Sequence, residues 1–232
     1  MIAIENLNQF YGSSHTLKNL SLEILPGSCT VIMGRNGVGK TTLMQCITGL
    51  VAIKSGVMRL GDQIALHSLP AEKRAAAGIG FVPQGRQIFP LLTVEENLRI
   101  GLRARRDGQK NIPDLVYDLF PVLKQMTSRR GGDLSGGQQQ QLAIGRALVT
   151  QPDVLLLDEP TEGIQPNVVQ DIGTIISTLN KEIGLTVVLV EQKLPFARRV
   201  GDYFVIMDRG EIVARGPMPE LGDDLVKQYL TV

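Results

Sequence analysis

The spacing of apolar residues predicts several strands in the first third of the chain. Some segments alternate apolar and polar residues, which is typical of half-buried strands, and others are short apolar runs. The strands expected are Ile2–Leu7, Leu20–Ile24, Thr30–Met33, Val57–Leu60 and Ile79–Val82. The third runs directly into a glycine, and a helix is expected from about Gly39, with Leu43, Ile47 and Leu50 on its buried face.

The middle of the chain, from about Gly85 to Thr127, has a different pattern. Thr93 and Glu96 have the spacing of a capping box, in which each side chain bonds the other residue's backbone N–H at a helix start. Several arginines follow, and a polar linker spans Asp107–Ile112. The segment is therefore expected to form helices with charged outer faces, inserted as a subdomain.

The second half of the chain returns to strands and helices. Val154–Leu157 and Val187–Val190 are uninterrupted apolar runs, the pattern of parallel strands that are covered on both faces. Val168–Leu179 between them predicts a crossover helix. Phe204–Met207 and Ile212–Ala214 predict a hairpin, so the fold class expected is α/β.

Composition limits the class of protein. The 232 residues suit one large domain with a sizeable core, and 24 basic against 23 acidic side chains give no reason to expect a nucleic-acid partner. Cys29 and Cys46 lack metal-site spacing and are interpreted as buried free thiols in a reducing cytosol. No apolar run approaches the roughly 20 residues that span a bilayer. We expect a soluble intracellular chain.

A phosphate-binding loop is the most specific motif. The pattern G-x-x-x-x-G-K-[ST] is matched, with one further threonine, by Gly34, Arg35, Asn36, Gly37, Val38, Gly39, Lys40, Thr41 and Thr42. Glycines let several backbone N–H groups converge on one anion, and the following helix adds its positive dipole end. Lys40 is expected to reach the β- and γ-phosphates, and the Thr41 hydroxyl to bind Mg²⁺.

Two adjacent acids follow a predicted buried strand. Asp158 and Glu159 end the Val154–Leu157 run, at the strand edge where open α/β sheets bind ligands. Asp158 suits holding Mg²⁺, directly or through water. Glu159 suits the general base that activates the attacking water.

A second glycine pair begins another predicted helix. Ser135 and Gln138 have capping-box spacing, but that interpretation leaves Gly136 and Gly137 unexplained. Each glycine within a helix costs roughly 1 kcal/mol relative to alanine. The cost would be justified if an anion approached the helix N-terminus closely, which suggests a second half-site that meets the first across a dimer.

Together these motifs resemble the ATP-binding subunits of ABC transporters over essentially the whole chain. The resemblance implies a P-loop NTPase (RecA-like) ABC cassette with an antiparallel β subdomain, with residues 1–84 and 146–232 as catalytic core and about 85–145 as the helical subdomain. It implies ATP and Mg²⁺ as cofactors. For nucleotide binding it identifies Tyr11 as the residue that stacks on adenine, Gly34–Thr42 as the Walker A loop, and the LSGGQ signature with Ser135, Gly136, Gly137 and Gln138. For catalysis it identifies Gln84 as the contact to Mg²⁺ and the attacking water, Asp158 as the Walker B acid and Glu159 as the catalytic glutamate.

The same resemblance implies the partners. Family dimers are head-to-tail, so each ATP lies between one chain's Walker A loop and the other chain's signature. A second ATPase subunit, homo- or heterodimeric, and integral membrane permeases are therefore expected, with a solute-binding protein outside the membrane. The chain itself would lie in the cytoplasm, peripheral to the inner face of the cell membrane.

Two positions depart from the family pattern. Gln192 occupies the place of a usual histidine and is the candidate contact to the γ-phosphate, and Gln165 replaces a usual aspartate. The sequence around Gln192 and Glu162 resembles branched-chain and polar amino acid importers. Gly131–Leu134 and Gln138–Gln141 resemble urea importers more closely, so urea is the predicted solute and branched-chain amino acids are the alternative.

Two other functions compete with transport. A soluble ABC ATPase that acts on ribosomes or DNA usually has two cassettes or a long coiled coil, and this chain has one cassette and no sustained heptads. A regulatory module without turnover is disfavoured, because Lys40, Asp158 and Glu159 are all present.

Overall fold

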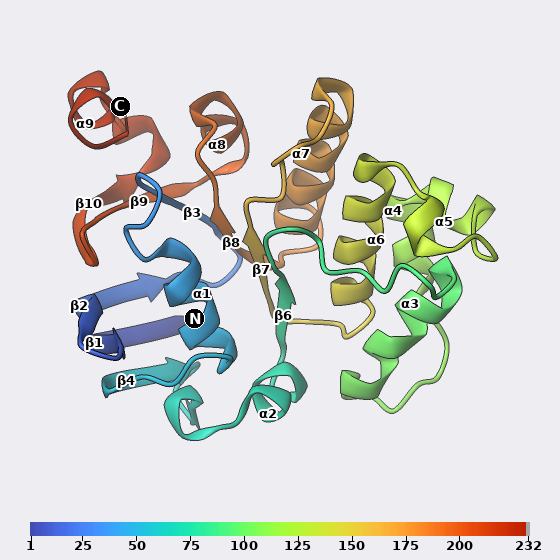
Figure 1. The fold of residues 1–232 in the computed structure, drawn as a ribbon, viewed down its shortest axis with the longest axis horizontal. Helices are drawn as coiled ribbons and strands as arrows, with labels where there is room; N and C mark the ends of the chain where they lie inside the picture. The colour runs from blue at the N-terminus through green and yellow to red at the C-terminus, as the bar shows by residue number, and fades with distance from the viewer. Residues whose placement is uncertain (231–232) are drawn as a thin grey trace.

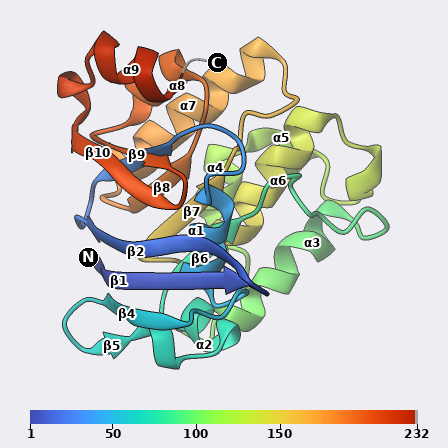
Figure 2. The same cartoon turned by 60° about the vertical axis from the view of Figure 1, so that its left-hand side comes forward.

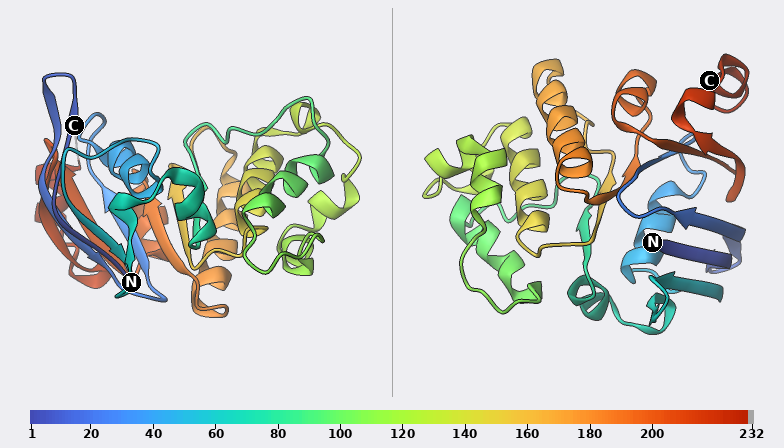
Figure 3. Two further views of the ribbon diagram at one scale, coloured as in Figure 1. Left: turned by 90° about the horizontal axis from the view of Figure 1, so that it is seen from below. Right: turned by 180° about the vertical axis from the view of Figure 1, so that it is seen from behind.

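A computed structural model describes residues 1–230 of the chain. Three parts lie side by side: an antiparallel sheet, a mainly parallel sheet with its helices, and a group of helices at the far end (Figure 1). Figure 3 shows the antiparallel sheet and the helical group at opposite ends of the molecule.

The antiparallel sheet has the strand order β2-β1-β4-β5 (Figure 2). Its strands are β1 (Ile2–Tyr11), β2 (Ser14–Ile24), β4 (Ser55–Leu60) and β5 (Ile64–Ala65). The predicted strand Leu20–Ile24 is only the second half of β2, because β1 and β2 pair as a hairpin from Tyr11 and Ser14 onward. The alternation of apolar and polar residues therefore predicted the second half of β2 but not its first half.

The second sheet has the order β10-β9-β3-β8-β7-β6 and is parallel except for β10. Its strands are β3 (Cys29–Met33), β6 (Ile79–Val82), β7 (Val154–Asp158), β8 (Thr186–Val190), β9 (Tyr203–Asp208) and β10 (Glu211–Pro217). All the strands predicted here are confirmed, including the hairpin of β9 and β10.

The apolar runs are uninterrupted because both faces of this sheet are covered. On β8, Val187 and Leu189 pack into one core cluster, whereas Val188 and Val190 pack into another. The first cluster lies under α6, α7 and α8, and the second lies between the sheet, α1 and the antiparallel sheet. Each residue of the strand is therefore buried on one side or the other.

The helices on and around the two sheets are α1 (Lys40–Thr48), α2 (Ala71–Ala76), α7 (Pro166–Lys181), α8 (Leu194–Val200) and α9 (Asp223–Tyr229). The helix α7 is the predicted crossover between β7 and β8. The short helices α2, α8 and α9 were not predicted, because six or seven residues carry little periodic signal. Single 3₁₀ turns span Leu66–Ser68, Leu102–Ala104, Gly131–Asp133 and Met218–Glu220.

The helical group contains α3 (Val94–Gly101), α4 (Asp114–Leu119), α5 (Pro121–Gln125) and α6 (Gly136–Leu148). The predicted capping box is confirmed at the start of α3, where the Glu96 N–H donates to Thr93 Oγ1 and the Thr93 N–H donates to Glu96 Oε2. The division of the chain into core and helical subdomain stays a prediction. Its proposed end at residue 145 falls inside α6.

One predicted core residue is wrong. Leu50 was expected on the buried face of α1, but it is 62 % exposed. The helix ends at Thr48 and Gly49 takes a left-handed conformation with φ 79°, so the helical spacing no longer applies to Leu50.

Two further expectations concern cysteines and membrane spans. Cys29 and Cys46 are buried and free, as expected, and burial raises the pKa of each thiol to about 12. Within residues 1–230, no helix combines the length and apolar character that crossing a bilayer requires.

Candidate functional site

The predicted phosphate loop connects β3 to α1. Gly34, Gly37 and Gly39 have φ values of 142°, 79° and 107°, which favour glycine. A Cβ on Gly34 would lie 2.3 Å from the Met207 carbonyl oxygen, so this turn also needs the space that glycine leaves. The loop therefore depends on its glycines for both conformation and packing.

Lys40 is buried within this loop. Its Nζ donates to the carbonyl oxygens of Gly34 and Arg35, both at 2.8 Å. Burial lowers the pKa of Lys40, while the charges of Glu159 and Asp158 act in the opposite direction. The ammonium group is thus held by its own loop, and a phosphate would offer it a charged acceptor instead of two neutral ones.

Asp158 ends β7 as predicted and is only 1 % exposed. Both of its carboxylate oxygens are buried, and within residues 1–230 no donor reaches either of them in full hydrogen-bond geometry. Burial raises the pKa of Asp158 to about 6, and the neighbouring Thr41 hydroxyl acts against this rise. A buried carboxylate without donors, beside a threonine hydroxyl, fits the oxygen ligands that Mg²⁺ prefers.

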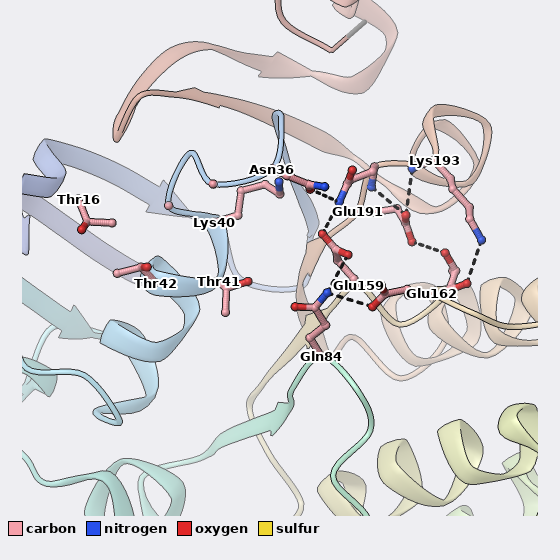
Figure 4. Close-up of a pocket in the computed structure, with 14 residues that line it drawn as sticks. Thr16, Asn36, Lys40, Thr41, Thr42, Gln84, Glu159, Glu162, Glu191 and Lys193 are labelled. Carbon is pink, nitrogen blue, oxygen red and sulfur yellow. Dashed lines mark hydrogen bonds between the residues drawn. The ribbon is translucent and has the colours of Figure 1, made fainter. Parts of the chain in front are cut away.

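Glu159 lies just beyond the strand in a left-handed conformation with φ 49°. This conformation is unfavourable for residues other than glycine, and it is held here by the Glu159 N–H donating to the Val190 carbonyl at 3.0 Å. Its carboxylate accepts from two amide side chains: Gln192 Nε2 at 2.5 Å and Gln84 Nε2 at 3.3 Å (Figure 4).

Each of the two amides also donates to a second acceptor besides Glu159. Gln192 Nε2 also donates to Asn36 Oδ1 of the phosphate loop at 2.8 Å, and Gln84 Nε2 donates to Glu162 at 3.0 Å. Hydrogen bonds therefore join the Glu159 carboxylate, in the loop after β7, to residues of three other loops: the phosphate loop, the loop after β6 and the loop after β8. The structure brings the predicted catalytic residues Lys40, Glu159 and Gln192 into one cavity.

This cavity has a volume of about 630 Å³. Its lining residues are Thr16, Asn36, Gly37, Gly39, Lys40, Thr41, Thr42, Gln84, Glu159, Thr161, Glu162, Glu191, Gln192 and Lys193. The arrangement offers backbone N–H groups and an ammonium to an anion on one side, and carboxylates to water or a cation on the other.

The comparisons with known proteins agree with this chemistry. The sequence profile of the family "ABC transporter" matches residues 17–162. This chain belongs to the ABC transporter family. A high-affinity branched-chain amino acid transport ATP-binding protein, BraG, of Pseudomonas aeruginosa is 39 % identical over 214 residues, which are 92 % of this chain and 91 % of the relative.

Other relatives of the family show a similar level of identity. A glutamine transport ATP-binding protein, GlnQ, of Geobacillus stearothermophilus is 34 % identical and covers 95 % of this chain and 92 % of its own. A dimeric ABC cassette solved in a post-hydrolysis state with ADP and phosphate is 28 % identical, with a TM-score of 0.82. The match covers 94 % of this chain and 99 % of that chain. The chain is therefore an ATP-binding ABC ATPase, and the predicted cassette fold is confirmed.

Tyr11, the predicted adenine contact, lies outside the cavity lining. The residue is 50 % exposed, and its hydroxyl donates to Gln45 Oε1 of α1 at 3.4 Å. An exposed aromatic beside α1 is available for stacking on a base, so its role stays a prediction.

The signature residues 135–138 also lie outside the cavity lining. They begin α6, on the far side of β6 and β7 from α1 (Figure 1). The predicted capping box is confirmed, with the Ser135 N–H donating to Gln138 Oε1 and the Gln138 N–H donating to Ser135 Oγ. One inference was incomplete: a Cβ on Gly137 would lie 2.7 Å from Val168 of α7, so helix packing already accounts for that glycine.

Several cavity residues were not predicted. The most notable is Glu191, a buried acid directly after β8. Its position after an apolar run is the same signal that identified Asp158 at the end of β7, and it could have been found in the same way. Thr161, Glu162 and Lys193 were missed because the loops after the two strands have no periodic pattern.

Proposed function

We propose that this chain is the ATP-hydrolysing subunit of an ABC importer of amino acids, with branched-chain amino acids as the foremost class. The support from the site is the carboxylate of Glu159 held between Gln84 and Gln192 next to a complete phosphate loop. The support for the solute is the similarity to BraG and to a probable branched-chain amino acid transport ATP-binding protein, LivF, of Archaeoglobus fulgidus, which is 37 % identical over 223 residues. The urea importer predicted from local motifs finds no such support.

In the proposed reaction, Glu159 accepts a proton from the attacking water. The amides of Gln84 and Gln192 hold that carboxylate in place, and the second contact of Gln192 with Asn36 sets it beside the phosphate loop. Lys40 exchanges its two loop carbonyls for phosphate oxygens. Mg²⁺, held by Thr41 and Asp158 with Gln84 close by, would neutralise the phosphate charge when bound.

A single chain would complete only half of this site. Ser135, Gly136 and the neighbouring N–H groups that open α6 lie away from the cavity of their own chain. We propose that they close over the nucleotide of a second subunit, as the dimeric assembly of related cassettes suggests.

Replacing Gln192 by alanine is expected to lower the turnover number for ATP about tenfold, because Glu159 loses its closest donor and the link to Asn36. Steady-state ATPase assays measure the effect. Gln170→Ala, on an exposed position of α7, is the matched control and should keep the wild-type rate. An unchanged rate in Gln192→Ala would remove Gln192 from the mechanism.

A second surface fits the membrane partner. A groove of about 320 Å³ lies where α2 and β6 face α3 and α6, and Leu50, Phe81 and Ile100 give it an apolar lining. Arg146 also lines the groove, and its Nη2 donates to the Gln87 carbonyl at 2.8 Å, in the loop that carries Gln84. We propose that a permease segment docks here and that Arg146 relays its position to the active site.

Leu50→Asp is expected to abolish solute uptake, because a charge in the apolar groove opposes docking. ATP binding by the isolated chain should stay at the wild-type level, since Leu50 lies outside the nucleotide cavity. Co-purification with the permease reports docking, uptake in cells reports transport, and a nucleotide-binding assay on the isolated chain reports ATP binding. Wild-type uptake in this variant would contradict the docking site.

The importer proposal is tested by uptake of labelled leucine, glutamine and urea in cells that lack this chain. We expect leucine uptake to be lost, to return with the wild-type chain and not to return with Glu159→Gln. Loss confined to glutamine would move the solute to polar amino acids, and loss confined to urea would overturn the proposal. Normal uptake of all three would exclude a role in their import.

A further inference from the structure

Glu191 is a buried acid for which the proposed chemistry has no direct use. It follows β8 and is only 3 % exposed. Its Oε1 accepts from the backbone N–H groups of Gln192 at 2.8 Å and Lys193 at 2.9 Å, and its Oε2 accepts from Thr161 Oγ1 at 2.7 Å. Burying a carboxylate is costly unless donors surround it, so three donors on one side chain indicate a purpose-built position.

The contacts of Glu191 connect two loops. One loop follows β8 and carries Gln192, and the other follows β7 and carries Glu159 and Thr161. Lys193 reinforces the same junction, because its Nζ donates to the Thr161 carbonyl at 2.9 Å. Figure 4 shows Glu191, Lys193 and Glu162 on one side of Glu159, away from Lys40.

This junction determines where the Gln192 side chain lies. Glu191 fixes the Gln192 backbone N–H, and the Gln192 amide then bonds Glu159 and Asn36. Because all these bonds belong to residues at the ends of adjacent parallel strands, a shift of one loop against the other would separate Gln192 from Glu159. Glu191 itself is poorly placed as a proton acceptor, since the residue is 3 % exposed and its carboxylate is held by three donors of the protein.

We propose that Glu191 is a positioning residue for ATP hydrolysis: its buried carboxylate joins the Gln192 backbone to the Thr161 hydroxyl and so keeps the Gln192 amide on Glu159. The proposal rests on the role given to Gln192 above. It assigns Thr161 a defined part, as the hydroxyl that ties the loop after β7 to the loop after β8.

The first test is Glu191→Gln, which keeps the shape of the side chain and removes its charge. We expect the turnover number for ATP to fall about tenfold while KM changes less than twofold, because the nucleotide contacts of the phosphate loop are untouched. Glu182→Gln, an exposed acid beyond the C-terminal end of α7, is the matched control and should behave as wild type. An unchanged turnover number in Glu191→Gln would overturn the proposal.

A double-mutant cycle distinguishes positioning from general stability. If Glu191 acts through Gln192, Glu191→Gln should cost less than twofold in the Gln192→Ala background. The same tenfold loss in both backgrounds would overturn the proposal. A Gln192→Ala variant with wild-type turnover would instead refute the role of Gln192, and Glu191 could then not act through it.

Thr161 variants keep the test decisive if Glu191→Gln folds poorly. Thr161→Val keeps the shape and removes the hydroxyl, and it should lower turnover severalfold. Thr161→Ser restores the hydroxyl and should recover most of the rate, with melting temperatures measured for both. Equal turnover in the two variants would contradict a role for the bond to Glu191.

Discussion

Glu159→Gln should bind ATP but hydrolyse it at least a hundredfold more slowly than the wild-type chain. General base catalysis contributes typically 10²–10⁴-fold, and an amide cannot accept the proton of the attacking water. The replacement keeps the size of the side chain at a backbone position held by the bond to Val190. Nucleotide binding and the fold should therefore survive the change.

Single-turnover hydrolysis and a direct ATP-binding assay measure the two effects separately. Glu162→Gln is the matched control, because Glu162 also accepts from Gln84 and lines the same cavity. We expect this control to lose no more than about tenfold, and we expect the ATP-bound Glu159→Gln chain to accumulate as a dimer in size-exclusion chromatography. A larger loss in Glu162→Gln than in Glu159→Gln would transfer the base to Glu162.

The sequence was informative wherever a local pattern has one physical cause. The apolar runs of β7 and β8 required two covered faces, and the structure has a separate core on each side. The phosphate loop was equally predictable, because its glycines are needed for backbone conformation within a few residues. The prediction that Leu50 is buried was wrong because the helical period was continued one residue beyond Gly49, the glycine that ends α1.

The contacts that organise the site could not be predicted from local patterns, because they join residues far apart in the sequence. Gln192 lies 33 residues from Glu159 and 156 residues from Asn36 along the chain, and only the sheet order brings them together. The resemblance identified Gln192 as the replacement for a histidine and gave the γ-phosphate as its contact, but it gave no partner for Gln192 within the protein. The buried bonds of Glu191 were missed for the same reason, since Thr161 is 30 residues away.

Asp158→Asn should make the nucleotide-free chain more stable while it abolishes hydrolysis. The Asp158 carboxylate is buried without a donor, and its pKa is raised from 3.8 to about 6. Above pH 6 the folded chain must hold a charge that the unfolded chain holds in water, which costs roughly 3 kcal/mol for a shift of about two pKa units. A buried asparagine still lacks partners, so we expect a net gain of about 1–2 kcal/mol and a melting temperature higher by about 2–8 °C.

The sign of the pH dependence makes this prediction specific. Since the folded-state pKa is the higher one, the cost of the charge is full above about pH 6 and disappears as the pH falls toward 3.8. The difference in melting temperature between Asp158→Asn and wild type should therefore shrink as the pH is lowered from 7.5 to 5. Adding Mg²⁺ and ATP should raise the melting temperature of the wild type more than that of the variant, because only the carboxylate can hold the cation well. A variant less stable than wild type at pH 7.5 without nucleotide would show that Asp158 stabilises the fold and is not held under strain for its ligand.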